Sequence, residues 1–370
     1  MPTARRVLVI GPSWTGALPN SYAQAFERLG MEVTSFDHEQ ALFRASPFAS
    51  NRLYRRVFRR SLWGKLNCQT LYLARAIKPS LIFAARASYL EAETVARLRR
   101  EFGIPVVNYY PDHPYCGTPL DPRKPSTLRR NLIEVMREYS AVWIWERGLR
   151  DRLRADGVTA EYLPFGVDPK IFQPQGDGSA AVCNECGRPH RIAFVGSWIR
   201  LRSEHMKAIR RHAVSIWGDG WPAAWRQKDS HHFVHSPTYG ESASRIHAHS
   251  DISLNVVGDL NVPGHNMRTF EVPASGGVML SRYTREQDEL FPENVAATYY
   301  RSPAELDARI SWLLSEPEAR ARIRREAVRM AAGHTYDQRA AVLLRAHGLS
   351  HDAPMPPKVP LRSDDQGPRG

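Results

Sequence analysis

Short apolar runs alternate with amphipathic segments along most of the chain. The runs "RRVLVIG", "MEVTSFD", "SLIFAA", "IPVVNYY" and "AVWIWE" are rich in β-branched and aromatic residues, which is typical of buried strands. Segments with helical spacing lie between them, such as "NSYAQAFERLG", with an Asn cap and a closing Gly, and "LEAETVARLRREFG". Strands that alternate with helices predict a parallel sheet covered on both faces.

The alternation is interrupted once and then resumes. "EYLPFGVDPKIFQP" has three prolines, and "QGDGSAAVCNECGRPH" predicts a loop. The strands "RIAFVGS", "VSIWGDG", "DISLNVV", "GGVMLSRY" and "ATYY" follow. We therefore expect an α/β protein with two Rossmann-like, doubly wound domains that face a central cleft. The predicted units are residues 1–165, a linker at 166–190, a second domain at 191–333, a helix at 334–348 that can cross back, and a disordered tail at 349–370.

Length and charge narrow the class of protein. A chain of 370 residues is long enough for two cores. Its net charge of +13 favours polyanionic partners, which include nucleic acid, anionic lipid and phosphorylated substrates. No apolar run reaches the roughly 18 residues of a membrane span. Because Gly11 and Pro12 end the first apolar run after four residues, we expect a strand and a cytoplasmic protein rather than a signal peptide.

The stretch "NMRTFEVPASGGVMLSRYTREQDELF" carries the most informative chemistry. Gly264 to Thr269 lie at the start of a predicted helix, whose free N–H groups can bind phosphate, and Arg268 can add a charged contact. Glu271 can accept two hydrogen bonds from a ribose diol, and Gly276-Gly277 permit a tight turn. The spacing predicts a nucleotide-diphosphate site, although a surface helix with stray charges fits the same spacing. The candidate ligands are Asn266, Met267, Arg268, Thr269 and Glu271.

This stretch resembles the donor-binding core of glycosyltransferases with the two-domain GT-B architecture, and most of all the CgeB-like, spore maturation protein type. "YRSPAELDARI" and "HTYDQRA" follow in the order expected for that group. The resemblance implies that Glu271 of "EVPASG" binds the donor ribose, and it matches Glu289 to a second family glutamate. Many members of the superfamily have another Glu eight positions before the ribose Glu. Pro263 stands there, so the sugar-side contacts stay open.

Three further segments extend the resemblance. "LPFGVDPKIFQP" resembles the GT-B interdomain linker, and "FVGS", which ends at Ser197, resembles the first strand and loop of the nucleotide-binding domain. A basic residue soon after that loop reaches the diphosphate in related enzymes, which implies Arg200 or Arg202, with Lys207 as a weaker candidate. Gly11 in "GPSWTG" resembles the loop that approaches the transferred sugar.

Candidate acceptor residues lie in the first half of the chain. Asp112 and His113 follow the strand "IPVVNYY", so either side chain can orient an acceptor hydroxyl or take its proton. The alternative is a proline-flanked turn in which Asp112 caps a helix. Arg86 and Glu146 also follow strands, and we expect them to be members of structural ion pairs.

Two other motifs allow different readings. Cys183, Cys186 and His190 form half of a zinc site, which His205 or His212 could complete, but we expect a solvent loop and no bound metal. The stretch from 51 to 77 predicts a long basic helix whose apolar arc packs on the sheet. Docking on an anionic membrane is the alternative. The arc is formed by Leu53, Tyr54, Val57, Phe58 and Leu62.

The predicted function is that of a glycosyltransferase, hexosyltransferase-like and metal-independent, that moves a sugar from a nucleotide-sugar donor to an acceptor. The acceptor is a polysaccharide, a lipid-linked glycan, a protein or a small molecule. The likeness to the EAxAxG enzymes implies retention of anomeric configuration, whereas inversion would require a base such as Asp112 or His113. Two alternatives are a non-catalytic scaffold that binds nucleotide or polyanion, and a sugar-nucleotide epimerase. No nucleic-acid-binding pattern is present, so nucleic acid is not an expected partner.

Overall fold

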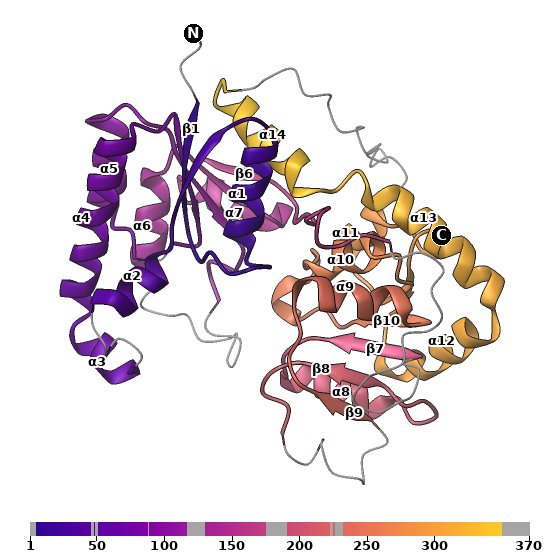
Figure 1. Cartoon of the computed structure of the whole chain (residues 1–370). Coiled ribbons are helices and arrows are strands. Elements are labelled where there is room, and N and C mark those ends of the chain that lie inside the picture. The colour runs from indigo at the N-terminus through magenta and orange to yellow at the C-terminus, as the bar shows by residue number, and fades with distance from the viewer. Residues whose placement is uncertain are drawn as a thin grey trace.

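The computed structural model describes residues 5–45, 48, 51–87, 89–116, 130–174, 191–222, 225 and 232–349. They form two six-stranded sheets in which every pair of neighbouring strands is parallel (Figure 1). This confirms the predicted pair of doubly wound α/β domains. We call each sheet with its covering helices the N-terminal and the C-terminal domain. The predicted boundaries at residues 165 and 191 stay predictions.

The N-terminal sheet has the strand order β2-β1-β3-β4-β5-β6. Its central strands are buried along their whole length because helices cover both faces. The strands are β1 (Arg6–Ile10), β2 (Glu32–Phe36), β3 (Leu81–Ala85), β4 (Val106–Tyr110), β5 (Ala141–Ile144) and β6 (Ala160–Tyr162). The helices are α1 (Leu18–Arg28), α2 (His38–Ala45), α3 (Arg52–Val57), α4 (Arg59–Ile77), α5 (Ala92–Arg100), α6 (Arg130–Glu138) and α7 (Arg147–Ala155).

The C-terminal sheet has the order β12-β11-β10-β7-β8-β9. Its strands are β7 (Ile192–Val195), β8 (Ser215–Trp217), β9 (Phe233–His235), β10 (Ile252–Asn255), β11 (Met279–Arg282) and β12 (Thr298–Tyr300). Its helices are α8 (Arg200–Ala208), α9 (Gly240–His249), the short 3-10 turn η4 (Asp259–Asn261), α10 (Arg268–Ala274), α11 (Arg285–Leu290), α12 (Pro303–Ser315) and α13 (Pro317–Ala331).

The last helix, α14 (Tyr336–Ala346), packs against α1 of the N-terminal domain (Figure 1). Asp337 of α14 forms an ion pair with Arg28 of α1. Arg339 is buried, and its Nε donates to the carbonyl oxygens of Pro164 (3.1 Å) and Phe165 (3.3 Å) in the segment after β6. The end of the chain thus ties the C-terminal domain to the N-terminal one.

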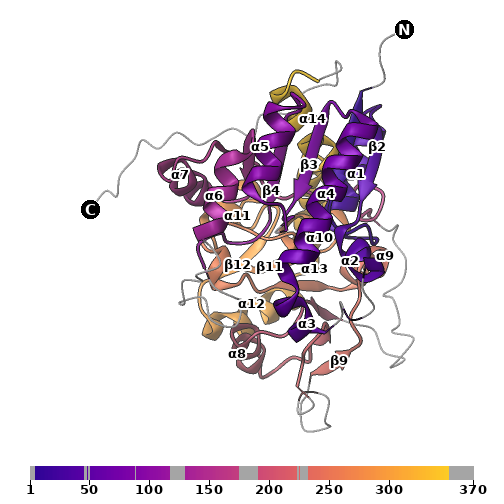
Figure 2. The same ribbon diagram turned by 90° about the vertical axis from the view of Figure 1, so that its left-hand side faces the viewer.

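Some predicted elements begin elsewhere or were missed. The first helix begins at Leu18 after Ala17, so the expected Asn cap was wrong. The predicted helix over 51–77 is divided at Phe58 into α3 and α4. Its apolar arc does not pack on the sheet, since Leu53 is 70% exposed and Val57 67% exposed, while Leu62 is buried. The arc turns outward because α3 lies at the tip of the domain, beyond the reach of the sheet (Figure 2).

Within the described residues, no helix combines the length and the apolar composition that crossing a membrane requires.

Candidate functional site

The carboxyl edges of the two sheets meet, and we call this region the interdomain seam. Trp14 follows β1 and Tyr239 follows β9, and their ring centroids lie 5.9 Å apart. Gly264, in the loop after β10, approaches the residues that follow β5. A Cβ atom on Gly264 would lie 2.7 Å from the Trp145 ring and 2.8 Å from Glu146 Cγ. Residues after the strands of both sheets therefore share one region, as in doubly wound proteins generally.

Helix α10 has seven residues and begins at Arg268, within the predicted start at Gly264 to Thr269. The two glycines that follow it make the tight turn into β11 that the sequence predicted. Gly276 has φ +80°, a conformation that favours glycine. A Cβ atom on Gly277 would lie 2.8 Å from the carbonyl oxygen of His247.

Two arginine side chains converge on the carboxyl end of β7. Nε of Arg268 donates to the carbonyl oxygen of Val195. The Arg202 guanidinium donates to the carbonyl oxygens of Ser197 (2.8 Å) and Val256 (3.5 Å). Neither arginine forms an ion pair with a carboxylate of the described residues. Among the described residues, Glu271 acts on Arg268 through space, but it forms no ion pair with either arginine.

The two charges lie close enough to affect each other. Burial, with a smaller contribution from Arg268, lowers the pKa of Arg202 to about 9. Burial also lowers the pKa of Arg268, although Glu271 opposes this shift. Two cations that are partly buried side by side cost free energy unless an anion joins them. The pair therefore has the electrostatics of an anion site.

Glu271 lies one helical turn after Arg268, in α10. Its main-chain groups are hydrogen-bonded. The Glu271 amide donates to the Met267 carbonyl oxygen, and the Glu271 carbonyl oxygen accepts from the Ser275 hydroxyl (2.8 Å). Its carboxylate has no hydrogen-bond partner among the described residues, and burial raises the pKa of this carboxyl while Arg268 opposes the shift. A partly buried carboxylate with both oxygens available can accept two hydroxyl hydrogen bonds.

A buried network of polar side chains holds the start of α10. Gln287 Oε1 accepts from Ser281 Oγ (2.8 Å), Thr269 Oγ1 (3.0 Å) and Asn255 Nδ2 (3.2 Å). Asn266 Nδ2 donates to Asn255 Oδ1 (2.9 Å). The side chains of Asn266 and Thr269 thus contact the protein interior. Asn255, Ser281 and Gln287 were not predicted, since only the fold brings them together.

The main-chain amides at the start of α10 form two groups, those that donate to carbonyl oxygens of the protein and those that do not. The amides of Thr269, Phe270 and Glu271 donate to carbonyl oxygens of Asn266 and Met267. The amides of Met267 and Arg268 donate to no acceptor among the described residues. These two N–H groups lie next to the Arg268 side chain and stay available to an anion.

The structure separates the predicted basic residues. Arg200 is exposed and pairs with Glu204 (2.8 Å) on its own helix, while Lys207 is exposed on the same helix. Ser197 is exposed, and its carbonyl oxygen holds Arg202. Gly11 is buried after β1, where a Cβ atom would lie 2.4 Å from Pro19. Arg202 therefore lies at the paired-arginine site, and Arg200 points away from it.

A second network, which sequence reasoning missed, joins the two domains at the seam. The Phe165 amide donates to His265 Nε2 (3.2 Å), so His265 Nδ1 carries the proton that it shares with Glu286 (3.0 Å). The Arg147 amide donates to the other oxygen of Glu286 (3.2 Å). The Arg147 guanidinium bonds Glu289 (2.5 Å). Glu289 thus forms an interdomain ion pair.

The predicted acceptor-side residues lie at the carboxyl edge of the N-terminal sheet. Asp112 pairs with Arg86 (3.1 Å), and both side chains are exposed. Arg86 follows β3 with φ +62°, which is rare for a non-glycine residue and is found at functional sites. His113 Nδ1 accepts from the Tyr115 amide (3.2 Å). Glu146 forms no ion pair with any residue that the structure describes; its carboxylate caps α7 by accepting from two amides at 2.6 Å.

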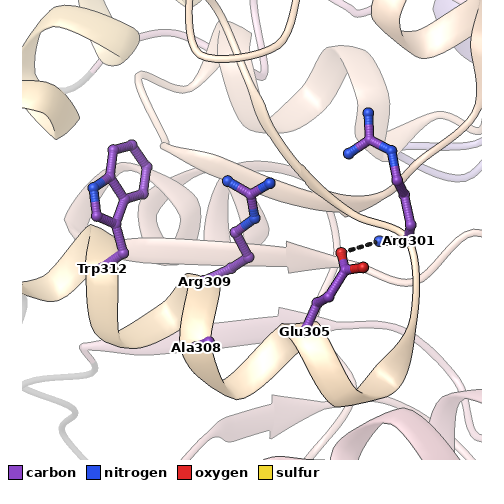
Figure 3. Close-up of a pocket in the computed structure, with 5 residues that line it drawn as sticks. All are labelled: Arg301, Glu305, Ala308, Arg309 and Trp312. Atoms are coloured by element: carbon purple, nitrogen blue, oxygen red, sulfur yellow. Dashed lines mark hydrogen bonds between the residues drawn. The ribbon is translucent and has the colours of Figure 1, made fainter.

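The remaining candidates lie elsewhere. The proposed zinc ligands Cys183, Cys186 and His190 fall outside the described residues, within which no cluster of metal ligands is found. His205 and His212 bond Leu201 and Ser311, respectively. A pocket on α12 is lined by Arg301, which follows β12, and by Glu305, Ala308, Arg309 and Trp312 (Figure 3).

Comparisons with known proteins concern the fold and the second half of the chain. Residues 200–345 match the glycosyl transferase-like family model. No curated protein sequence matches the chain. Among solved structures, sucrose-phosphate synthase from Thermosynechococcus elongatus is similar with a TM-score of 0.67 and 10% identity, over 93% of this chain and 98% of that one.

Two other structures are similar over nearly their whole length. A glycosyltransferase from Rickettsia africae has a TM-score of 0.64 and 10% identity, over 93% of this chain and 98% of that one. HepE from Anabaena, in complex with UDP-glucose, has a TM-score of 0.62 and 13% identity, over 92% and 99%. At such identities the likeness shows the fold alone. Residues 200–345 thus match the glycosyl transferase-like family, and the chain as a whole has the two-domain GT-B fold of these solved structures.

Proposed function

We propose that the protein transfers a sugar from a nucleoside-diphosphate sugar, whose diphosphate lies between Arg202 and Arg268. The observation that carries this proposal is the pair of partly buried arginines without a carboxylate partner in the described residues, next to a carboxylate without a hydrogen bond there. The amides of Met267 and Arg268 add donors for phosphate oxygen. Glu271 accepts from the ribose diol. UDP-glucose in the HepE complex is a donor of this chemical class.

The arrangement suits the chemistry of sugar transfer. Cleavage of the bond between the sugar and the diphosphate leaves negative charge on the departing nucleoside diphosphate. Two fixed guanidinium groups in a water-poor site stabilise this charge more in the transition state than in the ground state. Asn266 and Thr269 contribute indirectly, because their side chains hold the start of α10 in place. Ser197 contributes its carbonyl oxygen, which positions Arg202.

The acceptor binds, in this proposal, at the carboxyl edge of the N-terminal sheet. Arg86 orients Asp112 there, and His113 follows it in the chain, so these side chains are placed to contact an acceptor hydroxyl. Gly11 lies in the loop after β1, at the same edge. We infer retention of configuration and membership of the CgeB-like group from the "EVPASG" motif. With Pro263 in place of the superfamily Glu, other residues must contact the transferred sugar.

A donor panel tests the proposal. Wild type is screened with UDP-, GDP- and TDP-sugars for a rise in melting temperature and for slow donor hydrolysis. We expect one nucleotide class to stabilise the protein, and the matching sugar donor to be hydrolysed. Stabilisation by heparin with no response to any nucleotide would favour the non-catalytic scaffold.

The Glu271→Ala variant tests whether Glu271 belongs to the donor site. We expect this variant to remain folded, with weaker donor binding and slower hydrolysis. Glu318→Ala is the matched control, because Glu318 is exposed on α13 of the same domain. Equal losses in both variants, or no loss in a folded Glu271→Ala protein, would remove Glu271 from the donor site.

A further inference from the structure

The N-terminal domain carries an exposed apolar surface where α3 meets α4. Leu53 is 70% exposed, Val57 67% and Phe58 47%, and the next two residues are Arg59 and Arg60. We call these five residues the α3–α4 tip. Exposed aliphatic side chains cost free energy in water, and a group of them that alternates with arginines is typical of an interaction surface.

Side-chain contacts give the tip a fixed shape. The Asn51 side chain caps α3 by accepting from the amides of Leu53 (2.8 Å) and Tyr54 (3.2 Å). The ring of Tyr54 lies 4.5 Å from the ring of Phe58, between centroids. The Arg59 guanidinium lies 5.0 Å from the centroid of the Trp63 ring. These contacts hold the turn between the two helices while Leu53 and Val57 stay in solvent.

The charge around the tip has one sign. Between Gln40 and Leu90 the chain has no Asp or Glu. The same segment has ten basic residues, which are Arg44, Arg52, Arg55, Arg56, Arg59, Arg60, Lys65, Arg75, Lys78 and Arg86. Such a segment is attracted to a surface of dense negative charge and repelled by a second copy of itself.

The topology places the tip beyond the carboxyl edge of the N-terminal sheet. The end of α4 lies at the amino edge, because the carbonyl oxygen of Ile77 accepts from Arg6 at the start of β1 (3.0 Å). The 19 residues of α4 span about 28 Å, whereas a five-residue strand spans about 17 Å. The start of α4 therefore projects past the strand ends (Figures 1 and 2).

We propose that the α3–α4 tip docks on an anionic lipid surface. Leu53, Val57 and Phe58 enter the boundary between headgroups and acyl chains, while Arg59 and Arg60 contact lipid phosphates. A nucleic-acid partner fits less well, because the two most exposed side chains, Leu53 and Val57, are aliphatic and have no ring on which a base can stack.

Docking in this way also indicates the class of acceptor. The tip and the pair formed by Arg86 and Asp112 lie at the same edge of the sheet. A membrane that contacts the tip thus lies next to the acceptor-side residues, which suits a lipid-linked acceptor. Only this last step rests on the proposed function, since binding to lipid does not depend on catalysis.

Sedimentation of the full chain with vesicles tests the proposal. We expect wild type to bind vesicles of phosphatidylcholine and phosphatidylglycerol, to bind pure phosphatidylcholine weakly, and to lose affinity as salt rises. Arg59→Gln with Arg60→Gln should lower the partition coefficient about 30-fold, at roughly 1 kcal/mol per charge. Leu53→Ser with Val57→Ser should lower it by about tenfold or more.

Two matched controls lie on α4 away from the tip. Tyr72 is 71% exposed and Arg75 is exposed, and both lie in the second half of the helix. Tyr72→Ser and Arg75→Gln should bind vesicles as wild type does. Equal losses in the control and tip variants would overturn the proposal. So would a wild-type protein that does not bind anionic vesicles, or tip variants that bind them as strongly as wild type.

Two readouts identify another occupant or a failure of the donor site. Light scattering that shows a wild-type dimer, dissociated by Leu53→Ser with Val57→Ser, would assign the surface to a second copy and contradict the proposal. Tip-dependent binding of RNA or DNA with no vesicle binding would do the same. Donor hydrolysis in vesicle-free buffer should be unchanged in the tip variants. Loss of hydrolysis in Glu271→Ala with vesicle binding intact separates the two proposals.

Discussion

Arg202 and Arg200 are two positions apart on one helix and have opposite environments. Arg200 pairs with Glu204 in solvent, whereas the Arg202 guanidinium donates to the Ser197 carbonyl oxygen just after β7. Gly196 makes this possible, since a Cβ atom there would lie 3.3 Å from the Arg202 guanidinium. The motif near "FVGS" predicted a basic residue here but could not choose between the two. The choice depends on where α8 begins, and the helix begins at Arg200.

The two arginines provide a prediction at the residue scale. Arg202→Gln should weaken binding of a nucleoside diphosphate by roughly 10- to 150-fold, as expected for a hydrogen bond to a charged group worth about 1.5–3 kcal/mol. Arg200→Gln should leave the affinity unchanged, because that side chain is 89% exposed and pairs with Glu204. Calorimetric titration measures both. An equal effect of the two substitutions would show nonspecific attraction by positive charge.

At the scale of the elements, the sequence pattern identified the central buried strands and missed β6 and β9, which lie at sheet edges. β6 and β9 have three residues each and end their sheets, so neither has the continuous apolar run of a central strand. For helix α10, the sequence pattern predicted the element but not the contacts that hold it. The sequence predicted a helix at "NMRTFEV", but the network that fixes its first turn joins β10, β11 and α11 through side chains far apart in the chain.

This network predicts the effect of a substitution in α11. Gln287→Ala removes an acceptor of three hydrogen bonds and leaves buried donors on Asn255, Thr269 and Ser281 with fewer partners. We expect the free energy of unfolding to fall by about 3 kcal/mol, the upper range for an unsatisfied buried group. Urea denaturation measures the change, with the exposed Gln40→Ala as control. A loss as small as that of the control would contradict this role.

At the scale of the whole molecule, contacts that no sequence pattern signals join the two domains. Arg147 meets Glu286 and Glu289 across about 140 residues of chain, at separations of 139 and 142. Arg339 reaches back from α14 to the carbonyl oxygens of Pro164 and Phe165. The two α/β domains were predictable because each buried strand is a run of apolar residues in the sequence. The contacts between the domains were not predictable, because they depend on charged residues that the sequence does not distinguish from ordinary surface residues.

Buried neutral histidines predict how stability depends on pH. Burial lowers the pKa of His247 and of His334 to about 3, and His334 accepts from Arg339 (2.8 Å) through Nδ1. The unfolded chain takes up protons below its histidine pKa of about 6.5, while these folded residues do not. Their stabilising contribution is therefore complete above pH 6.5 and is lost as the pH falls toward 3.

By pH 5 each of the two histidines should cost about 2 kcal/mol of folding free energy relative to pH 7.5. Urea denaturation at pH 7.5, 6 and 5 follows this change. Gln in place of His247 should reduce the slope of stability against pH, whatever it does to stability at pH 7.5. A free energy of unfolding that stays constant from pH 7.5 to pH 5 would show that these rings accept protons in the folded state.

The most direct test of the central claim pairs Glu271 with the ribose diol. Affinities of UDP and of 2′,3′-dideoxy-UDP are measured by calorimetry for wild type and Glu271→Ala, with another base if the donor panel selects one. We predict that wild type binds UDP at least about tenfold more tightly than the dideoxy compound, and that the variant binds both equally. The same preference for UDP in both proteins would contradict the account, because Glu271 would then not contact the diol.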